Sequence, residues 1–86
     1  MNKHKQIHIG KLIKDVVSQK GIKTSWLAEQ LGCHRNNIYL IYARSWIDTE
    51  TLMQLCYILE YDFFASLSTY FQQQQMQSIY GQKAKI

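Results

Sequence analysis

Apolar residues recur at helical spacing in several stretches of the chain, and glycine or helix-capping residues separate these stretches. The first stretch covers residues 9–19, where apolar positions lie three or four residues apart. Gly21 follows and is suited to the left-handed conformation that ends many helices. A second helix is expected to begin at Thr24 or Ser25, either of which can cap it, and to end at Gly32.

Two further helices are expected in the middle of the chain. One begins after His34 and continues to about Ala43, and the loop RSWI follows it. Asp48 or Thr49 can cap the next helix, because a carboxylate or hydroxyl oxygen accepts hydrogen bonds from free N–H groups of the first turn. The apolar stripe of this helix consists of Leu52, Leu55, Cys56 and Leu59.

A fifth helix is expected after Asp62, its predicted N-cap, with Phe63, Phe64 and Leu67 packed inward. The glutamine run that follows is compatible with an extension of this helix or with a mobile tail. No strand alternation, linker or repeat is found in the sequence. The pattern therefore predicts an all-α compact bundle of about five helices over residues 1–71, with a Gln-rich extension or tail over 72–86.

Composition and charge narrow the class of protein. The chain has 86 residues, 47% of them hydrophobic, which suits one small folded domain rather than a disordered chain. Its start has no sustained apolar run, and no stretch approaches the ~20 apolar residues of a membrane span. We therefore expect a cytoplasmic protein without a membrane segment.

The charge is divided along the sequence. Residues 1–47 contain eight basic and two acidic residues, a net charge of +6, whereas residues 48–71 contain four acidic and no basic residues. Such a division is typical of a face turned toward a polyanion, and equally of a solvated basic surface. Lys3 and Lys5 are expected to add non-specific attraction or to form a basic arm.

Several kinds of chemistry find no support in the residues. Cys33 and Cys56 lack metal-ligand or disulfide-framework spacing and are expected to be small buried thiols. The three histidines, His4, His8 and His34, have no carboxylate or cysteine at metal spacing. There is no paired-acid, phosphate-loop or nucleophile-plus-base signature. We expect no metal, no cofactor and no enzymatic activity.

The second and third expected helices have the spacing of a helix-turn-helix. Ala28 is small enough for the closest approach of two steeply crossing helices, and Gly32 is free to adopt the positive φ of the turn. The apolar residues of the wedge are Leu27, Leu31, Ile38 and Ile41. A structural helical hairpin is the alternative interpretation.

The stretch SWLAEQLGCHRNNIYLIYAR resembles the helix-turn-helix core of phage repressor and Cro-type regulators, the Xre-like group. The resemblance covers roughly residues 8–70 and implies the lambda-repressor-like domain of short bacterial regulators. The sequence departs from the pattern at Tyr42, Ala43 and Arg44, where many members end the helix with Glu and continue with Asn-Gly or Arg-Gly. The loop after the third helix and its backbone-phosphate contacts are therefore expected to differ.

The resemblance implies that the third helix enters the major groove of DNA. The implied base-contacting residues are Arg35, Asn36, Tyr39 and Leu40. Arginine pairs with both acceptors of guanine and asparagine with adenine, whereas Leu40 would touch a thymine methyl group or pack. The expected phosphate contacts are Lys23, Thr24, Ser25, His34, Asn37 and Arg44. His34 is also the expected N-cap of the third helix.

The resulting hypothesis is a sequence-specific regulator, a repressor, that binds double-stranded DNA. A homodimer is expected to form through the C-terminal aromatic cluster, which comprises Tyr61, Phe63, Phe64, Tyr70 and Phe71. Two alternatives stay open. One is an antitoxin-like or phage-type DNA-binding protein with a protein partner at its C-terminal segment, and the other is a helical adaptor that does not bind DNA.

Overall fold

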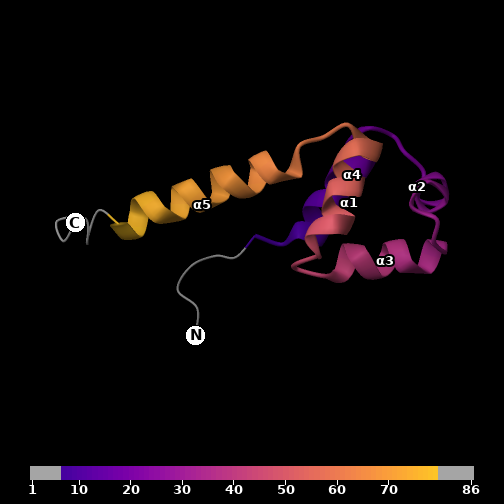
Figure 1. The fold of residues 1–86 in the computed structure, drawn as a ribbon, viewed down its shortest axis with the longest axis horizontal. Helices are drawn as coiled ribbons and strands as arrows, with labels where there is room; N and C mark the ends of the chain where they lie inside the picture. The colour runs from indigo at the N-terminus through magenta and orange to yellow at the C-terminus, as the bar shows by residue number, and fades with distance from the viewer. Residues whose placement is uncertain (1–6, 80–86) are drawn as a thin grey trace. The chain divides into compact units, whose positions relative to one another are not determined.

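The computed structural model describes residues 7–79, with side chains described to residue 74, and this part of the chain contains five α-helices and no strand (Figure 1). They are α1 (Ile9–Gln19), α2 (Thr24–Leu31), α3 (Arg35–Ala43), α4 (Thr49–Leu59) and α5 (Phe63–Ile79). The predicted all-α fold is confirmed. The chain divides into two units, one formed by His8–Tyr61 and a second that contains α5.

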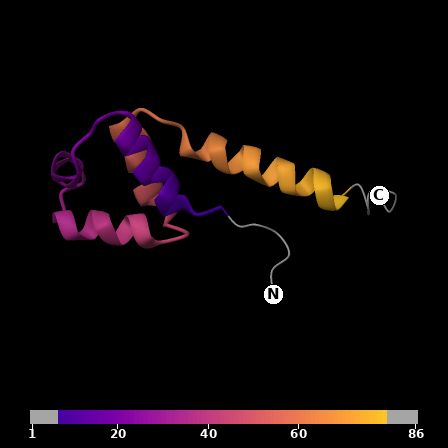
Figure 2. The same ribbon diagram turned by 180° about the vertical axis from the view of Figure 1, so that it is seen from behind.

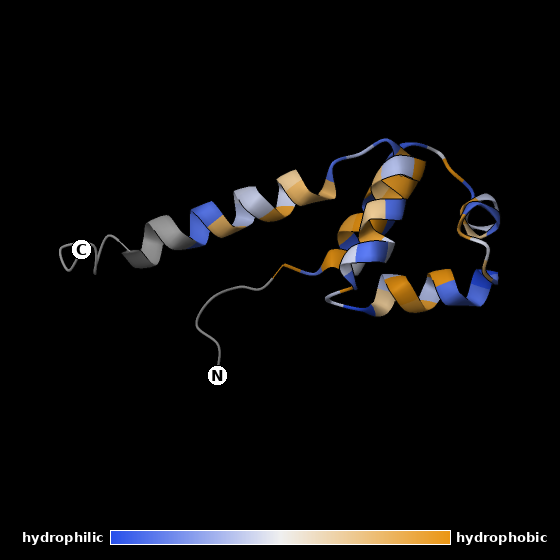
Figure 3. Ribbon diagram, viewed as in Figure 1, coloured by the Kyte–Doolittle hydropathy of each residue, from blue (hydrophilic) through white to orange (hydrophobic). Residues whose placement is uncertain are grey.

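The core of the His8–Tyr61 unit is built from the apolar faces of α1 to α4. α3 packs against α1 and α2, and α2 also packs against α4. Figure 3 shows hydrophobic and hydrophilic residues on the same helices, as expected for amphipathic helices with one buried face. The buried apolar residues of this unit are Ile9, Ile13, Val16, Val17, Leu27, Ala28, Ile38, Leu52, Leu55 and Leu59.

The ends of the helices follow local chemistry. Gly21 and Gly32 have positive φ angles of 68° and 71°, as their places after α1 and α2 predict. The carboxylate of Asp48 accepts hydrogen bonds from the N–H and the hydroxyl of Thr51, both at 2.9 Å, which confirms Asp48 as the N-cap of α4. At the start of α1, Nδ1 of His8 accepts from the N–H of Lys11 at 3.1 Å.

The prediction that Thr24 or Ser25 caps α2 is wrong. The N-cap is Lys23, and no side chain caps this helix. The hydroxyl of Thr24 lies instead 3.4 Å from the hydroxyl of Tyr42 on α3. A tertiary partner for the hydroxyl thus replaces the local one, because α2 begins beside the last turn of α3.

The first turn of α1 lies against the connection from α3 to α4 (Figure 2). The N–H of Ile9 donates to the carbonyl of Ser45 at 3.1 Å, and that of Gly10 to the carbonyl of Arg44 at 2.9 Å. A Cβ atom on Gly10 would lie closer than 3.0 Å to three backbone carbonyl oxygens. Glycine at this position therefore permits the close approach of α1 to the segment that ends α3.

The second unit is described by α5. Asp62 caps this helix as predicted, since its carboxylate accepts from the N–H of Ala65 at 3.0 Å. The helix continues through the glutamine run to Ile79, so within the described residues the run is helical. Phe63 is buried, whereas Phe64, expected to pack inward, is 38% exposed. Lys3, Lys5 and residues 80–86 lie outside the described residues.

Candidate nucleic-acid interface

The turn between α2 and α3 has the geometry that a helix-turn-helix requires. Gly32 adopts the left-handed conformation, and the N–H of Cys33 donates to the carbonyl of Ala28 at 3.0 Å. Ala28 is itself buried, in agreement with its expected place where the two helices approach each other closely. The turn therefore sets the direction in which α3 leaves α2.

α3 is buried on one face and exposed on the other. Ile38 is completely buried, and Ile41 and Tyr42 are half-buried, so these residues anchor the helix to the domain. The four residues predicted to contact bases are all exposed: Arg35, Asn36, Tyr39 and Leu40. No acidic residue occurs between Arg35 and Ala43. The outward face of α3 thus presents a guanidinium group, an amide and two apolar side chains to solvent.

His34 is confirmed as the N-cap of α3. Its Nδ1 accepts from the N–H of Asn36 at 3.0 Å, so a neutral imidazole ring with this bond carries its proton on Nε2. The side chain is exposed, which leaves Nε2–H as a hydrogen-bond donor at the start of the helix. His34 can therefore order the first turn of α3 and donate to an acceptor outside the protein.

The start of α2 offers donors to an anion. Lys23 and Ser25 are exposed, and Thr24 is half-buried beside Tyr42. Because α2 lacks a side-chain cap, no side chain competes with a phosphate oxygen for the N–H groups of its first turn. Tyr42 in turn makes an edge-to-face contact with Tyr39, with ring centroids 6.1 Å apart. These contacts join the start of α2 to α3.

An open hollow of about 200 Å³ lies between the second half of α3 and the start of α4. It is lined by Asn37, Leu40, Ile41, Arg44, Ile47, Asp48 and Thr51. The hollow brings two predicted phosphate contacts, Asn37 and Arg44, next to an acidic group. Hydrogen bonds from Thr51 hold the pKa of Asp48 below its ordinary value of 3.8, and the nearby charge of Arg44 contributes in the same direction. Asp48 is therefore a carboxylate at neutral pH, and it lowers the net positive charge around Arg44.

Both tryptophans are more exposed than their hydrophobicity predicts. Trp46 is 72% exposed in the loop after Arg44. Trp26, near the start of α2, is 42% exposed. The sequence indicates the exposure of Trp26 only weakly. Its neighbours on the helix surface, Glu29 and Gln30, are polar, but the adjacent Leu27 belongs to the core.

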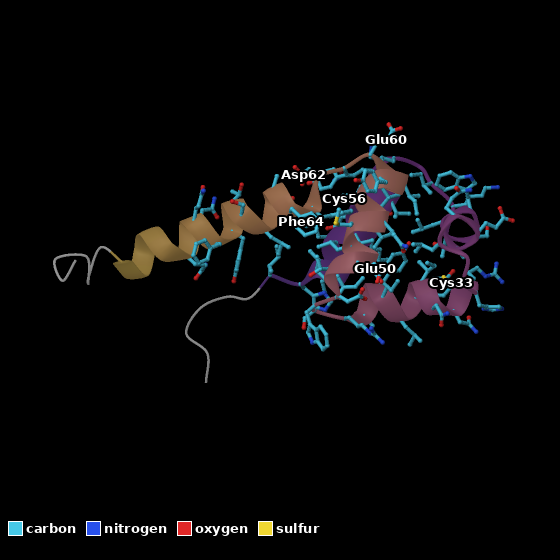
Figure 4. The ribbon with its side chains drawn as sticks, in the orientation of Figure 1. Cys33, Glu50, Cys56, Glu60, Asp62 and Phe64 are labelled. Atoms are coloured by element: carbon cyan, nitrogen blue, oxygen red, sulfur yellow. The ribbon has the colours of Figure 1, made fainter. Side chains whose placement is uncertain are left out.

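The two cysteines do not form a site. Cys33 lies in the turn before α3 and Cys56 on α4 (Figure 4), and both are free and half-buried rather than fully buried as expected. Among residues 7–79, no group of three or more His, Cys, Asp or Glu side chains is arranged to hold a metal ion. The described helices also include none with the length and apolarity needed to cross a membrane.

A comparison with protein families identifies the part of the chain that carries this interface. The family model described as a Cro/C1-type HTH DNA-binding domain matches residues 12–64, more than half of the chain. The matched segment begins within α1, contains α2 to α4 and ends at the start of α5. No significant match was found among curated proteins or solved structures. The extent of the family match and the geometry of α2 and α3 agree, and the chain belongs to the family of Cro/C1-type helix-turn-helix DNA-binding domains.

Proposed function

We propose that this DNA-binding protein is a sequence-specific transcriptional repressor that acts in the bacterial cytoplasm and binds an operator with α3 in the major groove. The observation that carries the proposal is the outward face of α3, where Arg35 and Asn36 are exposed at the start of the helix. In helix-turn-helix proteins the N-terminal residues of the second helix reach base edges. In this proposal the protein acts by occupying its operator.

Arg35 and Asn36 are assigned to the bases because their side chains have fixed, two-point hydrogen-bonding geometry. The guanidinium group matches O6 and N7 of guanine, and the amide matches N6 and N7 of adenine. Each such pair discriminates against a wrong base by ~1–3 kcal/mol. His34 caps the helix from which both side chains project, and this hydrogen bond to the N–H of Asn36 supports their positioning.

Phosphate contacts are assigned to the edges of this surface. Lys23, Thr24 and Ser25 lie at the start of α2, whose first turn has no side-chain cap, and such a helix start favours an anion. Arg44 and Asn37 are exposed beside the hollow, and His34 retains its Nε2–H donor. Contacts of this kind fix the register of the domain on DNA but carry no sequence information directly.

A homodimer is part of the proposal. Phe64 and Phe71 on α5 are 38% and 59% exposed, and a two-fold dimer would cover such apolar side chains. A dimer binds two half-sites about one helical turn of DNA apart. Sedimentation over a range of protein concentrations tests this point, and a protein that stays monomeric at micromolar concentration on and off DNA contradicts it.

A second candidate function is the binding of a protein partner, as in an antitoxin-like regulator. Met53 and Tyr57 favour it, because they lie four residues apart on one face of α4 and are both exposed. A stable complex with a neighbouring gene's product would support this reading. An adaptor that has lost DNA binding would show only weak, salt-sensitive affinity for any duplex.

The experiment that tests the proposed function is selection from random duplex DNA, followed by anisotropy titrations on selected and scrambled duplexes over a salt series. We expect an enriched motif and a specific affinity well above the non-specific one. Asn36→Ala should weaken binding to the selected duplex by roughly 5- to 150-fold, since it removes ~1–3 kcal/mol, and leave the scrambled duplex nearly unaffected.

A matched control is Gln54→Ala, which truncates an exposed amide on α4, outside the proposed interface. It should change neither affinity. Equal losses on both duplexes for Asn36→Ala would remove this residue from base reading, and the absence of any enriched motif would refute the proposed operator recognition.

A further inference from the structure

The outward face of α4 is acidic and partly apolar. Met53 and Tyr57 on this face are 45% and 76% exposed. Glu50 in the first turn and Glu60 at the C-cap are exposed as well (Figure 4). At about 100° per residue, Glu50, Met53 and Tyr57 lie within about 60° of arc around the helix axis. Two large apolar side chains are therefore exposed between two carboxylates, and α4 contains no basic residue.

The outward face of α1 carries positive charge. Lys11 and Lys14 are exposed and three residues apart, so they lie on the same side of the helix. Asp15 borders this face and is the one acidic residue of α1. Lysine stems are apolar enough to cover a methionine or a tyrosine ring while the ammonium groups stay in water. An ammonium group over a tyrosine ring adds a cation–π attraction. The α1 face is thus complementary to the α4 face in charge and in chemistry.

The two faces lie on opposite sides of the His8–Tyr61 unit. α4 lies in front of α1 in Figure 1 and behind it in Figure 2, which is seen from the other side. The buried residues of both helices belong to the core between these faces. One molecule cannot bring its own two faces together, whereas two copies can. In both views α3 lies below α1 and α4, so such a contact leaves the outward face of α3 free.

We propose that the α4 face of one copy docks on the α1 face of a second copy in a head-to-tail contact. The contact is heterologous, because it uses two different surfaces of the same chain, and each copy keeps one face free for a further copy. It is distinct from a two-fold dimer through α5, which uses the same surface twice. Its expected consequence is cooperative occupation of neighbouring DNA sites. That consequence rests on the proposed function, whereas the contact between copies does not.

The contact is expected to be weak in free solution. It involves few side chains on each copy, and exposed ion pairs contribute little to association. High salt should weaken it further, because exposed charges are screened. On DNA, a copy bound at one site holds its free face close to the next site and raises the effective concentration there. A weak contact is therefore sufficient for cooperativity.

The test uses two charge-reversal variants of the full chain without DNA. Lys14→Glu alters the α1 face, and Glu50→Lys alters the α4 face. Association is followed by sedimentation at low salt from micromolar to millimolar concentration. The average mass of the wild type should rise beyond that of a dimer. Each variant alone should associate about fivefold more weakly, since an exposed attraction is exchanged for a repulsion. Unchanged thermal unfolding would show that both variants are folded.

An equimolar mixture of the two variants should regain the association, because each supplies the intact face that the other lacks. Both variants keep a net positive charge, since each substitution changes the +4 of the chain by two, so overall attraction does not explain a gain on mixing. The matched control pair is Lys20→Glu and Glu29→Lys, with the same charge changes at exposed positions outside both faces. Each control should associate like the wild type, and mixing the controls should have no effect.

Three results would overturn the inference. A wild-type mass that does not rise beyond a dimer would show that no head-to-tail contact forms. A mixture of Lys14→Glu and Glu50→Lys that associates no better than either variant alone would show that these faces do not meet. An equal gain on mixing the control pair would assign the effect to charge in general. These results leave operator recognition standing, whereas the absence of any enriched motif in the selection refutes operator recognition and leaves the contact standing.

Discussion

Replacing Gly10 with alanine tests the contact that joins α1 to the end of α3. Gly10 is helical and does not have a positive φ, so its backbone conformation suits alanine. A glycine inside a helix is normally destabilising by roughly 0.5–1 kcal/mol relative to alanine. On local grounds the substitution should therefore stabilise the protein.

The tertiary structure predicts the opposite. The new Cβ would lie closer than 3.0 Å to the carbonyl oxygens of Ile41, Tyr42 and Arg44, and backbone atoms cannot rotate away as a side chain could. If the first turn of α1 moves out, the N–H groups of Ile9 and Gly10 lose their acceptors. Each unpaired buried N–H group costs about 1–3 kcal/mol. The preference of a helix interior for alanine over glycine offsets about 1 kcal/mol of this total. We expect a net loss of about 3 kcal/mol.

The assay is thermal and urea unfolding followed by circular dichroism. A loss of this size corresponds to a decrease in Tm of about 15 °C for a domain of this length. Lys11→Ala, a change at the next, exposed residue of α1, should leave the Tm nearly unchanged. Gly21→Ala should cost about 1–2 kcal/mol through its left-handed backbone alone, since a Cβ there meets nothing within 4 Å. A Gly10→Ala protein at least as stable as the wild type would refute the close approach of α1 to the end of α3.

Two further substitutions test the ends of α4. Asp48→Asn retains a capping side chain but removes the carboxylate, whose pKa in the folded protein lies below its ordinary value of 3.8. The stabilisation that this carboxylate gives the wild type is present above pH 3.8 and is lost as the pH falls through the lower pKa of the folded state. The stability advantage of wild type over Asp48→Asn should thus shrink between pH 5 and strongly acidic pH, and a constant difference in Tm would contradict this reasoning. Glu60→Gly should raise the free energy of unfolding by roughly 0.5–1 kcal/mol, because Glu60 has a φ of 53° and glycine avoids the left-handed penalty at a smaller entropic cost. A decrease in the urea midpoint of Glu60→Gly would show that the glutamate side chain stabilises this turn.

Helix type and most helix boundaries could be predicted from the sequence because the interactions that set them are local. Gly21 and Gly32 end their helices through their own backbone freedom, and Asp48 and Asp62 begin theirs by accepting from N–H groups three residues away. The outward position of Arg35 and Asn36 also follows from local pattern, since Ile38 must face the core and the helix turns about 100° per residue. Their role in base reading stays a prediction.

Other features depend on residues far apart in the sequence. Thr24 looks like a helix cap by type, but its hydroxyl lies beside Tyr42, eighteen residues away. Gly10 looks like a weak point of α1, and only the position of the end of α3 shows why a side chain has no room there. Neither fact can be inferred from neighbours within one or two helical turns.

The sequence by itself determined the all-α architecture, the helix-turn-helix and the polar start of α3, since periodicity and capping act within a few residues. The tertiary structure decided which apolar residues are left outside: Leu40 and Trp46 are exposed while Ile38 and Ile41 are buried or half-buried. Hydrophobicity alone cannot make that choice, because burial depends on which faces of α1, α2 and α3 meet, and that is set by contacts such as those of Ala28 and Gly10.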